Sequence, residues 1–108
     1  MRRIAFLASL LFALMPAAAW AQAAPPIGYW TTDGNGERLL IEATGGCSFM
    51  AVGGVEVAGN CTWNPSSVGG ILTLYYATAR GLAPIYWSVI YRNATTITVD
   101  GDVFYRRQ

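Results

Sequence analysis

The chain of 108 residues has seven arginines, six acidic residues, no lysine and no histidine, and 54% of its residues are hydrophobic. Because its basic residues are few and scattered, we exclude nucleic acid and an anionic membrane surface as partners, since both require clustered positive charge. Without a histidine or lysine to act as a base beside a serine, we also predict that the protein is not an enzyme. We therefore expect no catalytic residue, no cofactor and no metal site.

The first 21 residues have the pattern of a secretory signal peptide. Two arginines precede an apolar stretch, Ile4 to Met15, and a small-x-small cleavage site, Ala19-Trp20-Ala21, follows it. We predict cleavage after Ala21, with Ala23 as the alternative, which leaves 87 or 85 residues (108 minus 21 or 23). The apolar stretch is shorter than the roughly 20 residues that span a bilayer. The short, arginine-led pattern looks bacterial, so we expect a periplasmic or secreted domain.

Residues 22–27 form a leader that Pro25-Pro26 holds extended, and residues 28–108 form one domain. The domain alternates short β-prone runs with glycine-rich or asparagine-rich turns and shows no helical period. The predicted strands are 28–32, 38–43, 47–52, 55–63, 70–78, 84–92, 95–99 and 103–107.

The pattern of runs and turns predicts an all-β fold of about eight short antiparallel strands in an up-and-down meander. We expect the meander to close into a small barrel, because closure removes both exposed edges, and we keep an open sandwich as the alternative. Membrane-spanning strands of roughly 9 to 11 residues would consume nearly the whole domain. We therefore predict that the barrel is not membrane-embedded.

Cys47 and Cys61 are the two cysteines, and in a small exported domain we predict that they form a disulfide. Alternation along their strands places both on the inward side. The two positions are symmetric about Gly54, so they lie directly opposite each other if their turn has three or five residues. A two-residue Gly53-Gly54 turn would put the sulfurs on opposite faces. We predict the odd-numbered turn and a disulfide worth about 3 kcal/mol in the chain-entropy model.

The fifth and sixth predicted strands place aromatic side chains on an outward face. If their turn centres on Arg80-Gly81, Tyr75 lies opposite Tyr86 and Thr73 lies opposite Ser88. The predicted binding face consists of Thr73, Tyr75, Tyr86, Ser88 and Arg92. Such residues on a rigid sheet are typical of protein recognition, because tyrosine offers contact area at a low entropy cost. The alternative is that the paired tyrosines only stabilise the hairpin from outside.

Gly28-Tyr29-Trp30, at the start of the first predicted strand, resembles the Gly-x-Trp signature of lipocalins and the wider calycin group. The resemblance implies a barrel whose tryptophan closes one end and packs against an arginine of the last strand. Here Trp30 would take that role with Arg106, or with the neighbouring Arg107, through a cation–π contact. It also implies a small hydrophobic ligand, but lipocalins are roughly twice as long, and strands this short leave little room for a cavity.

The chain also resembles the small periplasmic inhibitors of bacterial metalloproteases, which are exported eight-stranded barrels with a single disulfide. The matching features are Gly28-Tyr29-Trp30, the Cys47 and Cys61 pair, and Trp63-Asn64-Pro65 leading into Ile71-Leu72-Thr73-Leu74. In that family the extended N-terminal segment enters the protease cleft. The resemblance therefore implies that Gln22 to Ile27 would enter such a cleft here.

These features predict a small exported binding protein whose first candidate partner is another protein, recognised by the strand-face tyrosines. A small hydrophobic ligand in the barrel and inhibition of a periplasmic protease through the leader are the alternatives. The two binding functions differ in what the fold must provide. A protein partner requires exposed aromatic residues, whereas a ligand requires an apolar cavity of roughly 300 Å³ or more.

Overall fold

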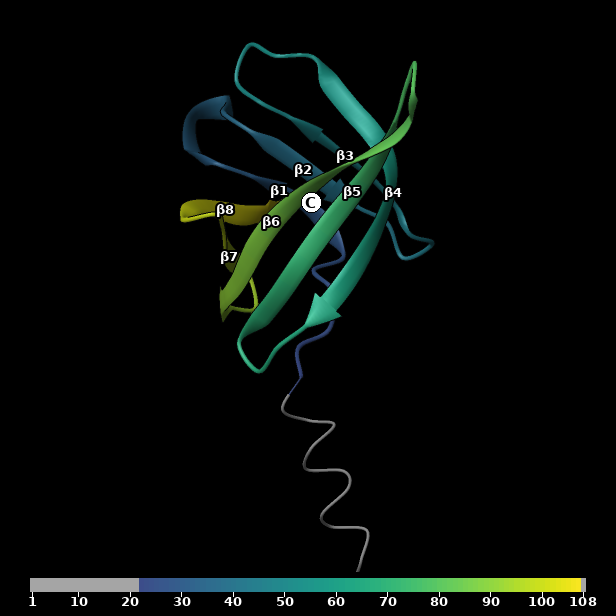
Figure 1. The fold of residues 1–108 in the computed structure, drawn as a ribbon. Helices are drawn as coiled ribbons and strands as arrows, with labels where there is room; N and C mark the ends of the chain where they lie inside the picture. The colour runs from purple at the N-terminus through teal and green to yellow at the C-terminus, as the bar shows by residue number, and fades with distance from the viewer. Residues whose placement is uncertain (1–21, 108) are drawn as a thin grey trace, which may run out of the picture.

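Eight antiparallel strands form a closed barrel in the computed structural model, which describes residues 22–107 (Figure 1). Each strand pairs with the next in sequence, and the last pairs with the first, which rules out the open sandwich. The strands are β1 (Gly28–Thr31), β2 (Arg38–Ile41), β3 (Gly46–Met50), β4 (Glu56–Pro65), β5 (Gly69–Thr78), β6 (Gly81–Asn93), β7 (Thr96–Val99) and β8 (Asp102–Arg107). A short 3-10 turn, η1 (Asp33–Asn35), joins β1 to β2. The predicted signal peptide, residues 1–21, lies outside the described residues.

Alternate residues of the strands fill the barrel, as the period of two predicts. The buried apolar side chains come from seven of the described strands and are Trp30, Leu39, Ile41, Cys47, Leu72, Leu74, Trp87, Val89, Ile97, Val99 and Phe104. Phe49, Val57, Cys61, Trp63, Ile85 and Tyr91 are partly buried and pack against them. Burial of this apolar surface is the main force that holds so small a domain together.

The disulfide joins Cys47 to Cys61, but the register between β3 and β4 differs from the prediction. Their turn has five residues, 51–55, as expected for an odd-numbered turn, yet it is centred on Gly53 instead of Gly54. Gly53 carries the positive φ of the turn, +66°, which glycine adopts without a steric cost. The placement of this one residue moves the register by two positions.

The shift of two residues puts Gly59, not Cys61, directly opposite Cys47. Because the shift is even, Cys61 keeps its inward orientation, and the disulfide forms along the diagonal with the two Cα atoms 5.9 Å apart. This separation lies in the usual range for disulfides. Val55, the first residue of the strand predicted at 55–63, lies in the turn instead, where 86% of its surface is exposed.

The predicted register between β5 and β6 is also wrong by two residues. Thr78 pairs with Gly81, so the turn consists of Ala79 and Arg80 alone. The Thr78 side chain fixes this turn, because its Oγ1 accepts a hydrogen bond from the Arg80 N–H (3.1 Å) and donates one to the Gly81 carbonyl (2.6 Å). Tyr75 therefore lies opposite Pro84 instead of Tyr86.

The strands differ greatly in length, and this shapes one end of the molecule. β5 and β6 have 10 and 13 residues, whereas β7 has only four. β6 pairs with β5 from Gly81 to Ile90, but its pairing with β7 begins only at Val89. The tip of the β5–β6 hairpin therefore stands apart from the barrel, at the upper right of Figure 1.

Candidate functional site

The predicted binding face is only partly assembled by the fold. Tyr86 is exposed over 62% of its surface, and Tyr75 is half-buried on the same side of the hairpin. They are diagonal neighbours, because Tyr86 pairs with Thr73 and Tyr75 with Pro84. Tyr86 thus presents an aromatic ring to solvent beside a second ring, on a two-stranded scaffold.

The other three residues of the predicted face, Thr73, Ser88 and Arg92, do not form one exposed surface with the two tyrosines. Thr73 is 6% exposed, because it lies between Thr62 on β4 and Tyr86 on β6. Ser88 is exposed at the margin of the hairpin, where its backbone is held by β7–β8 turn residue Asp100. Arg92 is exposed but lies six residues beyond Tyr86, about 20 Å along the strand.

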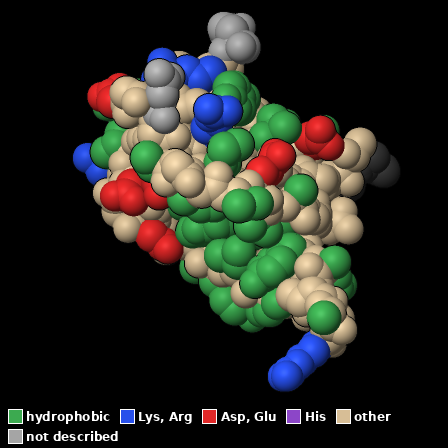
Figure 2. All heavy atoms as spheres, turned by 90° about the horizontal axis from the view of Figure 1, so that it is seen from above, with side chains coloured by type: hydrophobic (Ala, Val, Ile, Leu, Met, Phe, Trp, Pro, Cys, Tyr) green, Lys and Arg blue, Asp and Glu red, His purple; other side chains and the backbone are tan. Residues whose placement is uncertain are grey.

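Leu82 belongs to the exposed surface, although no sequence pattern indicated it. It shares the outward side of β6 with Tyr86, and 71% of its surface is exposed. Apart from Arg80 in the turn, the stretch from Ile71 to Tyr91 contains no charged residue. Figure 2, which views the molecule from above Figure 1, shows a continuous hydrophobic area over the middle and lower part of the view. A low-charge, partly aromatic surface of this kind is typical of protein interfaces.

The backbone of β6 also offers hydrogen-bonding groups along the open side of the hairpin. The Ser88 N–H donates to Asp100 Oδ1 (2.7 Å), and the Ser88 carbonyl accepts from the Asp100 N–H (2.8 Å). Since Ser88 therefore faces away from β5, the even-numbered residues Leu82, Pro84 and Tyr86 face the same way. Among the described residues, no strand pairs with this edge at positions 82 to 86. Pro84 has no N–H, and at this position of the edge no described neighbouring strand is present that could accept a hydrogen bond from one.

A second feature near this edge is an acidic hollow at the mouth of the barrel. The hollow has a volume of about 180 Å³, and its lining residues are Glu37, Phe49, Trp87, Val99, Asp100, Asp102 and Phe104. The Phe49 and Trp87 rings are in tilted contact with centroids 5.1 Å apart. Partial burial, followed by the charge of Asp102, raises the pKa of the Glu37 carboxyl above its usual 4.5. Carboxylates around an aromatic floor favour a positively charged group, but the described residues contain no cluster of three suited to a metal ion.

The opposite end of the barrel is closed by the leader, residues 22–27. Five successive leader carbonyls accept hydrogen bonds: Ala23 from Trp63 Nε1 (2.9 Å), Ala24 from the Tyr91 hydroxyl (2.7 Å), Pro25 from the Ile27 N–H (2.9 Å), Pro26 from Trp30 Nε1 (2.9 Å) and Ile27 from Arg106 Nη1 (2.9 Å). Burial raises the pKa of the Tyr91 hydroxyl, while Arg106 acts in the opposite direction. The leader is thus tied to the barrel along its length.

The contact expected between Trp30 and Arg106 is present at this closed end. The two residues pair across β1 and β8, and the guanidinium carbon lies 4.3 Å from the ring centroid. Trp30 is completely buried. Arg107 instead lies over Tyr105, at 5.8 Å, so Arg106 is the residue that covers the tryptophan.

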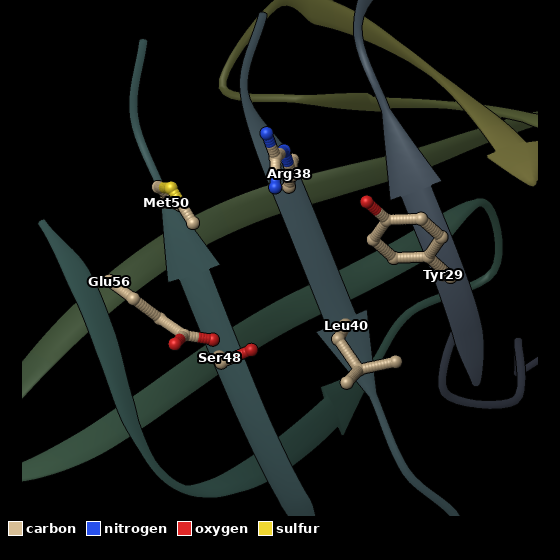
Figure 3. Close-up of a pocket in the computed structure, with 6 residues that line it drawn as sticks. All are labelled: Tyr29, Arg38, Leu40, Ser48, Met50 and Glu56. Carbon is tan, nitrogen blue, oxygen red and sulfur yellow. The ribbon is translucent and has the colours of Figure 1, made fainter. Parts of the chain in front are cut away.

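A further hollow lies on the outward face of β1, β2 and β3 and reaches the first residue of β4. It has a volume of about 180 Å³ and is lined by Tyr29, Arg38, Leu40, Ser48, Met50 and Glu56. In Figure 3 the Glu56 carboxylate points toward Ser48, and the Tyr29 hydroxyl points toward Arg38. Arg38 and Leu40, and likewise Ser48 and Met50, are two residues apart and therefore share one face of their strands. This spacing is the sequence signal that could have indicated a common surface here. It is a shallow depression with polar groups on two sides.

Two hollows at the ends of the barrel, both lined in part by core residues, are small. One at the closed end, beside Trp63 and Leu72, has a volume of about 110 Å³, and the acidic hollow has about 180 Å³. Both are below the roughly 300 Å³ of typical ligand pockets. Among the residues that the structure describes, no helix is long and apolar enough to cross a membrane.

Comparison of the chain with models of protein families, with curated proteins and with solved structures finds no match.

Proposed function

We propose that the domain is an exported binding protein that recognises another protein through the outward side of the β5–β6 hairpin. The observation that carries this proposal is the exposure of Tyr86 and Leu82 on a hairpin that projects beyond the barrel. A rigid two-stranded ribbon presents these side chains without loop entropy to lose on binding. We assign the protein no catalytic role.

Two features of the fold favour this proposal over the alternatives. Side chains fill the barrel, which leaves small hollows for a hydrophobic ligand. The leader carbonyls are bound to the barrel's own donors, so a leader that entered a protease cleft would first have to give up these bonds. The disulfide of so small a domain supports export to the periplasm or beyond.

Capture experiments with the Tyr86→Ala variant test this function. The immobilised domain is exposed to periplasmic and secreted protein from its own source, and retained proteins are identified by mass spectrometry. We expect the wild type to retain a partner and Tyr86→Ala to lose at least nine-tenths of it, because central aromatic residues dominate interface energies, with the melting temperature unchanged.

The matched control is Tyr29→Ala, which removes a tyrosine from the outward face of β1, away from the hairpin. It should retain the partner as well as the wild type does. Equal capture by Tyr86→Ala and the wild type contradicts the proposal. A lower melting temperature of Tyr86→Ala with intact capture would assign Tyr86 to stabilisation of the hairpin.

A further inference from the structure

The open edge of β6 is self-complementary, and we propose that it pairs with the same edge of a second copy of this chain. The edge comprises residues 82 to 86, which pair with β5 on one side and with no described strand on the other. An unpaired, uncharged strand edge is a template for another strand. This inference rests on the backbone of β6 and does not require the partner proposed above.

The positions of the backbone groups select one register for the pairing. In an antiparallel pair, hydrogen bonds join directly opposite residues, so the even-numbered residues of one copy must face those of the other. If two-fold symmetry centres on Pro84, Leu82 lies opposite Tyr86 of the second copy. Each of these two pairs forms two N–H···O=C bonds, which gives four in total.

Neighbouring registers satisfy fewer groups. A shift of two residues toward the barrel places Pro84 opposite Tyr86, which leaves the Tyr86 carbonyl of each copy without a donor. It also pairs Leu82 with Ser88, whose N–H and carbonyl already bind Asp100. A shift toward the tip places Pro84 opposite Leu82 and leaves a Leu82 carbonyl without a donor. In the central register the two prolines face each other and their carbonyls also lack donors, but the two pairs of Leu82 with Tyr86 form four bonds, whereas the two pairs that contain Pro84 in either neighbouring register form only two.

The side chains fit the same register. Leu82 and Tyr86 are both outward and highly exposed, at 71% and 62%, and would pack against each other twice across the seam. On the inner side, Ala83 of one copy meets Ile85 of the other, a small residue against a large one, and both are half-buried. Aromatic and branched pairs directly opposite each other stabilise sheets.

The charges are complementary as well. Arg80 is the one charged residue between Ile71 and Tyr91, and the central register brings it next to Asp100, which binds the Ser88 backbone of the second copy. The Asp100 carboxylate accepts a hydrogen bond from the Ser88 N–H, and Asp100 lines the acidic hollow together with Asp102 and Glu37. The pairing therefore joins each guanidinium to the acidic mouth of the opposite barrel, which occurs only when the second strand is antiparallel.

Analytical ultracentrifugation of the purified, disulfide-bonded domain tests the proposal. We expect a concentration-dependent dimer, and Leu82→Lys should raise the dimer dissociation constant at least tenfold, since it places a charge over the apolar seam. Ile71→Lys, a change at an exposed outward residue of β5 that lies off the edge, should leave the constant unchanged. Arg80→Glu should weaken the dimer, whereas Arg80→Lys should retain it.

Single cysteine variants report the register itself. Pro84→Cys should form an intermolecular disulfide under mild oxidation, because the two positions 84 face each other at the symmetry axis. Leu82→Cys should not, because its counterpart in the second copy lies about 13 Å along the strand. A monomer at all concentrations, a dimer insensitive to Leu82→Lys, or cross-linking at 82 without cross-linking at 84 each overturns the proposal. Capture of another protein by a monomeric domain would leave the proposed function intact.

Discussion

Gly28 and Arg106 give a physical reason for the Gly-x-Trp pattern at the start of β1. The backbone of Gly28 has a φ of +139°, which favours glycine. A β-carbon at this position would lie 2.6 Å from Arg106 Nη1, in the path by which the guanidinium crosses Trp30 to reach the Ile27 carbonyl. The glycine, the tryptophan and the distant arginine are therefore one packing unit, whatever family the chain belongs to.

Glu37 shows the opposite situation, a residue that costs stability when it is charged. Its pKa is raised in the folded protein, first by burial and then by Asp102, so the folded state binds the proton more tightly than the unfolded chain does. Stability must then fall as pH rises from about 4.5, the ordinary value, through the raised pKa of the folded state, and the loss is complete above it.

We expect Glu37→Gln to remove this pH-dependent loss. The melting temperatures of the variant and the wild type should agree at pH 4 and below, and the variant should be the more stable at pH 7. Thermal unfolding across this range measures the difference. A constant offset between Glu37→Gln and wild type at all pH values would contradict the assignment.

At the scale of elements, alternation of apolar and polar residues was sufficient to locate the strands and their inward faces. Each expected strand is present with boundaries shifted by at most three residues. Register was not accessible in the same way, because a shift of two residues leaves every side chain on its face. Both hairpin registers were wrong by two residues, and each depends on where a single glycine, Gly53 or Gly81, adopts a positive φ.

The candidate site was only partly predictable for a related reason. The exposed tyrosine followed from alternation in β6, but the open edge depends on β7 being much shorter than β6. The predicted lengths already differed, but which residues of β6 are left without a partner depends on the register between β6 and β7, whose pairing begins only at Val89. The burial of Thr73 by its neighbours Thr62 and Tyr86 is likewise a property of the sheet.

The disulfide links two of these elements, and we expect its removal to cost about 3 kcal/mol in the chain-entropy model. The loop that it closes has a sequence separation of 14 residues. Urea denaturation of the double variant Cys47→Ala and Cys61→Ala measures the change in the free energy of unfolding. Reduction of the wild type under the same conditions should give a similar loss. Unchanged stability in both would show that β3 and β4 are held by strand pairing alone.

At the scale of the whole molecule, the barrel is completed by a segment that belongs to none of its strands. The leader crosses the closed end, buries Pro26, and supplies acceptors to three aromatic donors and to Arg106. No sequence pattern indicated these bonds, because each one forms only when the barrel has brought the donor side chain next to the leader. The sequence-based prediction that Pro25-Pro26 holds the leader extended concerned only the conformation of the leader and not its contacts.

Removal of residues 22–27 should lower the free energy of unfolding by about 3 to 5 kcal/mol, because the buried Trp30 N–H and three other donors would lose their acceptors. Thermal and urea unfolding of the shortened domain provide the measurement. Removal of Gln22 alone keeps all five carbonyls and should have little effect. A shortened domain as stable as the original would mean that the leader is free to serve another purpose.

The hydrogen bonds between the leader and two tryptophans also allow the state of the closed end to be followed by intrinsic fluorescence. Trp30 and Trp63 direct their indole N–H groups at leader carbonyls, and indole emission responds to its hydrogen bonding and polarity. Detachment of the leader would therefore change the colour and intensity of the protein's own fluorescence before the barrel unfolds. Stopped-flow emission traces would time the sealing of this end against the formation of the strands, without any added dye.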